Sequence, residues 1–250
     1  MRSVGAVDAA AAADAIERDL RAVGTPERAE GERPYLKSEV EHVGATVPEI
    51  RKAAKGFSNG HPDLTRRELV AVVEALWSRP IHERRMAAVE LLAAHQALLD
   101  AADLDLVERL IRGSGTWALV DGLAIGVAGR LLDRDPDVAA RLDSWAGDED
   151  LWVRRAALIA WLVPVRGGAP LGRFGDYADA MLAEREFLIR KAIGWVLREA
   201  GKRRPDEVFD WLAPRTGRAS GVTVREAVKY LPEAGREELI AACRERRAAR

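Results

Sequence analysis

The stretch Gly113-Ser-Gly-Thr-Trp-Ala-Leu-Val-Asp-Gly-Leu123 contains a glycine-rich turn followed by a helical pattern. Trp117 and Asp121 are four residues apart, so at about 100° per residue their side chains lie about 40° apart on one edge of the predicted helix. The apolar residues of this helix turn to one side: Leu119, Val120, Leu123, Val127 and Leu131. The pair is therefore predicted at the border between core and surface, where a binding cleft would be lined. A core tryptophan beside a solvated acid gives the same pattern, so the role of the pair stays open here.

The same stretch belongs to a pattern that returns every 35 residues. One column of this pattern holds small residues and the next holds apolar ones: Ala87, Gly122, Ala157, Ala192 and Ala227, then Ala88, Leu123, Leu158, Ile193 and Val228. Stacked helix pairs need a small residue where two helices approach closely and an apolar residue where the core is filled. The repeat predicts an all-α protein, a superhelical solenoid of HEAT-like (armadillo-type) helix-pair repeats with a concave face.

The rest of the chain fits this class. An alanine-rich helix is predicted over residues 6–23, followed by a loop over residues 31–34 that leads to Tyr35, and by a short helix that opens at Thr46. From residue 64 onward we expect helices of about 12 to 18 residues, separated by short Gly, Pro and Asp breaks. No run of alternating β-branched residues predicts a strand. We expect a single repeat domain over residues 1–250, with residues 1–30 as an N-terminal helical cap.

Composition narrows the function classes. The 250 residues are 48% hydrophobic and carry a net charge of −1, so a nucleic-acid partner would have to be met by a local basic patch. No apolar run reaches the roughly 18 residues that a membrane helix needs, and acids in the N-terminal stretch argue against a signal peptide. We therefore expect a cytoplasmic protein without membrane contact.

Cysteine and histidine usage argues against a metal. The single cysteine, Cys243, excludes an internal disulfide and a cysteine-cluster site. The four histidines are scattered without metal-ligand spacing: His42, His61, His82 and His95. The sequence predicts that the chain uses no metal and no organic cofactor.

A third column of the repeat is mostly basic: Arg85, Val120, Arg155, Arg190 and Arg225. These arginines are expected in a row along one surface, where they could tie neighbouring repeats together or present positive charge. At the third position Val120 replaces the arginine and Asp121 follows it, so one carboxylate stands in a basic row. Such a carboxylate is a candidate for binding a cation. Trp195, one turn beyond Lys191, could add a second aromatic face, each face contributing about 0.5 to 2 kcal/mol by cation-π attraction.

At these residues the chain resembles the AlkD-like family of DNA alkylation-repair glycosylases, which are built from HEAT-like repeats. The resemblance spans nearly the whole chain, and its most specific pieces are residues 117–121, 151–157 and 191–199. Residues 77–80 and Tyr35 support it more weakly. The family often has a double tryptophan followed by an acid where this chain has Thr116, Trp117 and Ala118.

The resemblance implies a role for each matching residue. Asp121 would be the catalytic carboxylate, with Trp117 and Trp195 flanking the lesion nucleotide. Four residues would contact DNA: Arg155 on the backbone, Tyr35 near the lesion, and Arg190 and Lys191. The implied partner is double-stranded DNA that contains alkylated purines, and the implied state is a monomer in the bacterial cytoplasm or nucleoid.

The chemistry agrees with these residues. Alkylation at N7 or N3 makes a purine cationic and weakens its glycosidic bond, and a fixed carboxylate can stabilise the oxocarbenium-like sugar that forms. The sequence thus favours a monofunctional glycosylase that releases the base and leaves an abasic site. Two alternatives stay open: a non-catalytic DNA-structure-binding protein on the same scaffold, and a HEAT-type scaffold that binds proteins.

Overall fold

The computed structural model describes the backbone of residues 7–248 and the side chains of residues 7–245. Within this range the protein is helical and has no strand, because the only β-type pairing is an isolated bridge between Glu41 and Ile81. No helix in the described range is long and apolar enough to cross a membrane. The chain forms two compact units, Met1–Val127 and Ala128–Arg250. A single continuous repeat domain over residues 1–250 stays a prediction.

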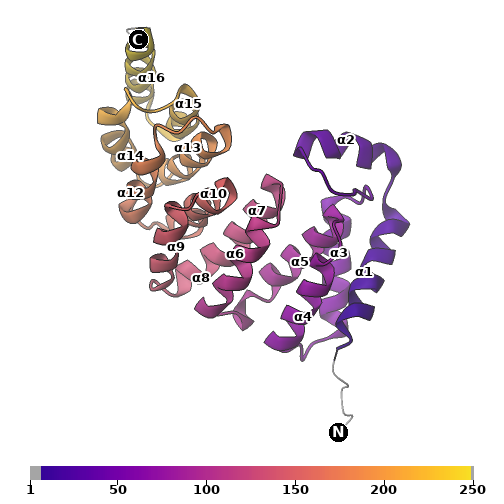
Figure 1. Cartoon of the computed structure of the whole chain (residues 1–250). Coiled ribbons are helices and arrows are strands. Elements are labelled where there is room, and N and C mark those ends of the chain that lie inside the picture. The colour runs from indigo at the N-terminus through magenta and orange to yellow at the C-terminus, as the bar shows by residue number, and fades with distance from the viewer. Residues whose placement is uncertain (1–6, 249–250) are drawn as a thin grey trace. The chain divides into compact units, whose positions relative to one another are not determined.

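The first unit is organised around α5, which packs against α1, α3, α4 and α7 (Figure 1). Nine of the thirteen residues of α5 are buried. The helices of this unit are α1 (Ala9–Val23), α2 (Pro26–Leu36), α3 (Val47–Gly60), α4 (Arg66–Trp77), α5 (His82–Ala94), α6 (Leu104–Arg112) and α7 (Trp117–Leu123), with short 3₁₀ turns at Gln96–Leu98 and Ala101–Asp103.

The second unit is organised around α13, which packs against α10, α11, α14 and α15. Its helices are α8 (Gly129–Arg134), α9 (Val138–Ala146), α10 (Leu151–Ala160), α11 (Leu162–Gly167), α12 (Gly172–Met181), α13 (Phe187–Gly201), α14 (Pro205–Leu212), α15 (Gly221–Ala227) and α16 (Glu233–Ala248). Two 3₁₀ turns, Ala213–Arg215 and Val228–Tyr230, follow α14 and α15, and a π-helical segment, Ala124–Ala128, leads from α7 to α8.

The 35-residue repeat is confirmed, because its columns fall on corresponding helices, α5, α7, α10, α13 and α15, except that Val228 is in the 3₁₀ turn directly after α15. Every residue of the apolar column is buried, and so are the four alanines of the small column. The remaining residue of the small column is Gly122, on α7. A Cβ added to it would stand 2.6 Å from Cγ1 of Val89, on α5. A side chain at this point would push α7 away from α5, so the column is small because the helices meet there.

Side-chain caps explain where several helices begin. The helix predicted to open at Thr46 does so, and Thr46 and Glu49 form a capping box at the start of α3; Thr65 and Glu68 form another at α4. Asp150 caps α10 by accepting hydrogen bonds from the backbone N–H groups of Trp152 and Val153. These contacts satisfy the N–H groups that the first helical turn leaves without partners.

Two sequence-based predictions about elements are wrong. Residues 31–34 are helical, because Thr25 caps α2, Pro26 occupies its first turn, and Arg28 and Glu32 form an ion pair one turn apart. Many helices after residue 64 are also shorter than the expected 12 to 18 residues. One run is divided at Trp161 because Pro164 has no N–H to bond the carbonyl of residue 160.

Candidate nucleic-acid interface

The turn that opens α7 is held by two hydrogen bonds between a side chain and a backbone carbonyl. Thr116 is buried, and its hydroxyl donates a hydrogen bond of 3.1 Å to the carbonyl of Leu36, at the end of α2. Arg85 on α5 donates a hydrogen bond of 3.0 Å to the carbonyl of Gly113. Gly115, at φ 62°, has the left-handed backbone that suits glycine. The start of α7 is therefore tied to both α2 and α5.

Trp117 and Asp121 lie on one edge of α7, as predicted. Both are half-buried, whereas Leu119, Val120 and Leu123 on the same helix are fully buried. The pair thus stands at the border between core and surface, with a carboxylate one helical turn from an indole.

Tyr35 joins this edge from α2. Its ring lies 5.7 Å from that of Trp117, between centroids, at an interplanar angle of 85°. Tyr35 is 71% exposed. An exposed aromatic ring set edge-on against a half-buried indole offers a surface on which a nucleobase or sugar can pack. Sequence reasoning named Tyr35 from resemblance alone. The Thr116–Leu36 contact that places it was missed, because the two residues are 80 positions apart.

Trp77 and Arg85 pack against the same turn. The Arg85 guanidinium lies 5.3 Å from the centroid of the Trp77 ring, and a Cβ added to Gly113 would stand 3.3 Å from the indole nitrogen. Burial lowers the pKa of Arg85. Arg85 therefore acts here as a half-buried link between helices, which is one of the two roles predicted for the arginine column.

Arg155 in the second unit makes the same kind of contact. It is buried on α10, and its guanidinium donates a hydrogen bond of 2.6 Å to the carbonyl of Leu188, in the first turn of α13. Arg190 is half-buried and donates to the carbonyl of Glu184. Both arginines thus bond to backbone carbonyls, as Arg85 does, and not only to acids. The predicted DNA contacts of Arg155 and Arg190 stay predictions.

Lys191 and Trp195 lie one turn apart on α13. Lys191 is exposed and Trp195 is half-buried, while Ile189, Ile193 and Val196 of the same helix are buried. Phe187, one turn before Lys191, is 57% exposed, and its ring centroid is 6.0 Å from the Lys191 ammonium nitrogen. Phe187, Lys191 and Trp195 form a stripe, which we call the α13 stripe. Sequence reasoning missed Phe187, although its four-residue spacing before Lys191 could have indicated it.

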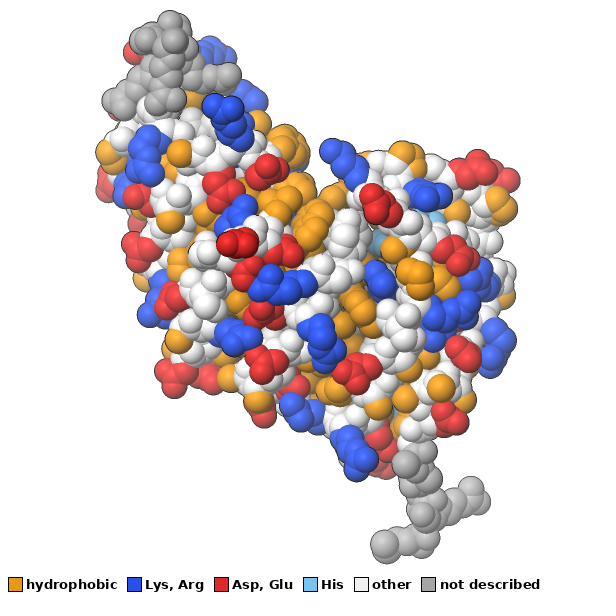
Figure 2. Space-filling model, viewed as in Figure 1, with side chains coloured by type: hydrophobic (Ala, Val, Ile, Leu, Met, Phe, Trp, Pro, Cys, Tyr) orange, Lys and Arg blue, Asp and Glu red, His pale blue; other side chains and the backbone are white. Residues whose placement is uncertain are grey.

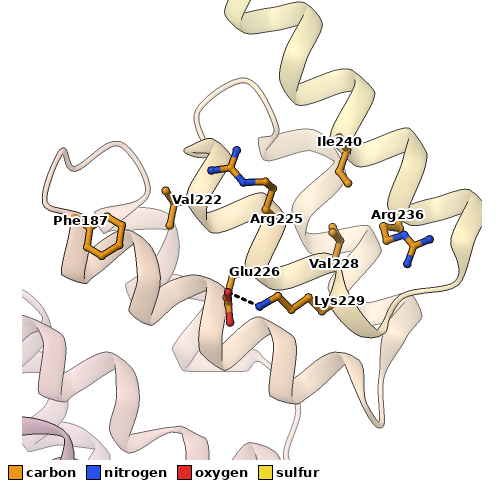
Figure 3. A pocket seen from close by; sticks show the side chains of 8 residues that line it. All are labelled: Phe187, Val222, Arg225, Glu226, Val228, Lys229, Arg236 and Ile240. Carbon is orange, nitrogen blue, oxygen red and sulfur yellow. Dashed lines mark hydrogen bonds and ion pairs between the residues drawn. The ribbon is translucent and has the colours of Figure 1, made fainter. Parts of the chain in front are cut away.

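A surface pocket of about 600 Å³ adjoins the α13 stripe (Figure 3). It is lined by Phe187, Val222, Arg225, Glu226, Val228, Lys229, Arg236 and Ile240. Burial alone would raise the pKa of Glu226, but its ion pairs with Lys229 and Arg198 outweigh burial and hold the pKa below its usual value. Two of its three basic side chains are ion-paired, Lys229 with Glu226 and Arg236 with Glu233. The lining still holds more basic than acidic side chains, which suits an anion such as a phosphate.

Positive and negative side chains are interspersed over each unit (Figure 2). On the face shown, the described residues present no large area of one charge. Binding to DNA would therefore depend on local groups such as those around the α13 stripe, in agreement with the net charge of −1.

The fold and these surfaces define a helical-repeat protein, and the comparisons assign the family. The model of a family described as "DNA alkylation repair enzyme" matches residues 16–231. The chain belongs to this family of DNA alkylation repair enzymes.

Solved structures share the fold. A predicted DNA alkylation repair enzyme from Enterococcus faecalis is 22% identical, with a TM-score of 0.76 over 84% of this chain and 97% of that one. AlkD2 from Streptococcus mutans is 15% identical, with a TM-score of 0.64 over 90% of this chain and 99% of that one. The protein smu.31 from Streptococcus mutans UA159 is 17% identical, with a TM-score of 0.58 over 74% and 93%. No curated protein matches the chain significantly.

Proposed function

We propose that this protein is a monofunctional DNA glycosylase that excises cationic N3- and N7-alkylated purines from duplex DNA. The observation that carries the proposal is the half-buried carboxylate of Asp121, one turn from Trp117, on an edge that the exposed Tyr35 ring extends. Membership in a family of DNA alkylation repair enzymes supports it.

Each residue has a chemical role in this proposal. The C1′–N bond breaks, and its electron pair leaves with the cationic purine, which becomes a neutral base. Asp121 stabilises the positive charge that develops on the sugar, and water adds to C1′ and releases a proton to the carboxylate or to solvent. The faces of Trp117 and Tyr35 pack against the cationic nucleotide. Neither a metal nor a cofactor takes part in this step.

The decisive experiment replaces Asp121 by Asn, which keeps the size of the side chain and removes its charge. Single-turnover release of N7-methylguanine from methylated duplex should fall by about 10²-fold or more, comparable to losing a main electrostatic contributor. Binding to a non-cleavable lesion analogue should be equal or slightly tighter. Asp19→Asn, the same change on the exposed surface of α1, is the matched control and should leave release unchanged.

The outcomes separate the three functions. Wild-type release by the Asp121→Asn variant would remove this carboxylate from the mechanism. Binding to alkylated duplex without base release by the wild type would favour a DNA-structure-binding protein. Failure to bind duplex at low salt would favour a protein-binding scaffold.

We further propose that the α13 stripe contacts the DNA backbone. Lys191→Ala should weaken binding to lesion and undamaged duplex alike and reduce the salt dependence of binding by about one phosphate contact. Lys55→Ala, on the exposed face of α3, serves as the control. Equal salt slopes for Lys191→Ala and the wild type would contradict the contact.

A further inference from the structure

Three side chains from separate segments of the first unit converge. Glu32 lies on α2, His42 lies between α2 and α3, and Glu83 lies in the first turn of α5. Each offers one ligand atom, and these atoms all lie within 4.8 Å of one another. A histidine nitrogen with two carboxylate oxygens is a donor set that zinc and similar divalent ions accept.

Polar atoms in this group lack the partners that burial demands. The His42 side chain is only 1% exposed, yet neither ring nitrogen has a hydrogen-bond partner in the described structure. The Glu32 oxygen Oε2 has none either, and its distance of 3.8 Å from Nδ1 of His42 is too long for a hydrogen bond. Buried polar atoms are nearly always satisfied, so atoms left bare at one point indicate a ligand between them.

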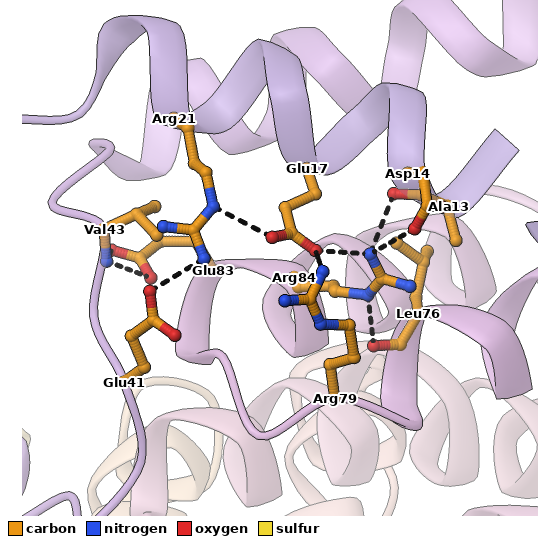
Figure 4. A network of polar contacts seen from close by, with 10 residues as sticks. All are labelled: Ala13, Asp14, Glu17, Arg21, Glu41, Val43, Leu76, Arg79, Glu83 and Arg84. Carbon is orange, nitrogen blue, oxygen red and sulfur yellow. Dashed lines mark hydrogen bonds and ion pairs between the residues drawn. The ribbon is translucent and has the colours of Figure 1, made fainter. Parts of the chain in front are cut away.

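The surroundings hold each donor in place. Both Glu83 oxygens accept backbone hydrogen bonds: Oε1 accepts from Val43 at 3.1 Å and from Gly44 at 2.6 Å, and Oε2 accepts from Val43 at 3.0 Å. Figure 4 shows Glu83 beside Val43. The other oxygen of Glu32 accepts from Arg28 at 3.0 Å. The His42 ring stacks on His82, with centroids 4.6 Å apart. Outer contacts of this kind orient metal ligands and raise their affinity.

We propose that Glu32, His42 and Glu83 bind one divalent ion of the zinc class, which joins α2 to α5. Two ligands at about 2.1 Å from zinc are at most about 4.2 Å apart. The 3.8 Å between Glu32 and His42 meets this limit, and small side-chain shifts would bring in Glu83. The two carboxylates and Arg28 sum to one negative charge, which a divalent cation offsets. A surface pocket of about 420 Å³, lined in part by His42 and Val43, provides a path for entry.

The proposed ion explains how α2 is held. Leu36 is the only buried residue of this helix, so α2 has no apolar stripe to bury against its neighbours. A metal that links Glu32 to α5 would take the place of that stripe, as metals do in small domains with little core. Its role is to hold the helix that carries Tyr35. It goes beyond the proposed function and does not depend on it.

Zinc titration of untagged, chelator-treated protein tests the proposal. Calorimetry should detect one tightly bound Zn²⁺ per chain, and saturating zinc should raise the unfolding midpoint. Glu32→Gln and His42→Gln should each weaken binding at least tenfold and abolish the zinc-dependent shift. Glu27→Gln, an exposed carboxylate on the same helix, is the matched control and should bind zinc like the wild type. Glu83 is not varied first, because its carboxylate also accepts backbone hydrogen bonds.

Cobalt gives a second readout that does not depend on stability. Co²⁺ bound by one histidine and two carboxylates should produce visible absorption that zinc displaces, and both variants should lack it. Two results would overturn the proposal: no stoichiometric zinc binding by the wild type, or equal zinc affinity in Glu32→Gln and Glu27→Gln. Neither of these results bears on base release, so the glycosylase proposal would stand or fall separately.

Discussion

The helices α5 and α2 belong to the same unit but are held in opposite ways. Nine of the thirteen residues of α5 are buried, whereas α2 buries Leu36 alone among its eleven. α5 packs against four helices, α1, α3, α4 and α7, and its buried Arg84 forms an ion pair with Glu17 on α1. α2 is held by polar contacts such as the one between Thr116 and the Leu36 carbonyl.

The difference shows where rigidity and function lie in this unit. The rigid α5 positions the turn that opens α7 through Arg85 and Gly113, and so it positions Trp117 and Asp121. The weakly packed α2 carries the exposed Tyr35 to their side. Segments with few buried apolar contacts open most easily, and a surface that must receive a ligand is often built on such a segment.

Substitution of Arg84 tests how strongly its buried polar contacts hold α5 in place. Its buried guanidinium donates to Glu17 at 2.5 Å and to the carbonyls of Leu76 and Ala13 (Figure 4). Arg84→Ala should lower the free energy of unfolding by about 3 kcal/mol, because the carbonyls lose their donor and the buried Glu17 carboxylate keeps only Arg21 and Arg79. Urea denaturation measures this loss. Arg18→Ala, an exposed arginine on α1, should change stability by less than about 0.5 kcal/mol.

Acid titration sharpens the same test. Burial raises the pKa of Glu17, but its hydrogen bonds to Arg21 and Arg84 outweigh burial and leave the pKa below 4.5. Its stabilising contribution is complete above the unfolded value and is lost as pH falls through the lowered folded value. Glu17→Gln should therefore flatten the loss of stability below about pH 4.5. An unchanged acid profile would show that this network does not stabilise α5.

Gly122 tests the close approach between α5 and α7. Gly122→Ala should cost about 1 to 3 kcal/mol, since the new methyl group would press on Val89. Adding Val89→Ala should recover part of the loss, which a double-mutant cycle would measure. Gly56→Ala is the matched control on α3, where an added Cβ meets nothing within 4 Å, and it should be neutral or stabilising by about 0.4 to 1 kcal/mol. Equal effects of the two glycine substitutions would contradict the packing argument.

Thr116 tests the loosely held side, and the smallest global effect is expected here. Thr116→Val keeps the shape of the side chain and removes its hydrogen bond to Leu36, so stability should fall by about 1 kcal/mol. Hydrogen exchange should increase in α2 more than in α5, and base release should fall modestly as Tyr35 loses its position. Thr216→Val, which removes a comparable hydroxyl contact in the second unit, should leave α2 exchange unchanged. Equal exchange in α2 before and after Thr116→Val would show that other contacts hold this helix.

The sequence by itself determined the helical class, the 35-residue repeat and the edge shared by Trp117 and Asp121. These features follow from local rules: the period of side chains along a helix, the chemistry of caps such as Thr46 with Glu49, and the need for a small residue where helices meet. The loop predicted over residues 31–34 failed for a related reason. Glycine and proline were taken as breakers, although the cap and the ion pair of α2 outweigh them.

Only the tertiary structure decided which distant residues share a surface. Tyr35 lies beside Trp117 because the Thr116 hydroxyl bonds to the carbonyl of Leu36, 80 positions earlier in the chain. Glu32 and Glu83 come together from two helices whose sequences share no pattern. It also showed that Arg85 and Arg155 bond to backbone carbonyls about one repeat further along the chain, at Gly113 and Leu188, which their spacing left open. Periodicity reports the direction of a side chain from its own helix. It carries no information on which other helix stands opposite, because that depends on how all the helices pack.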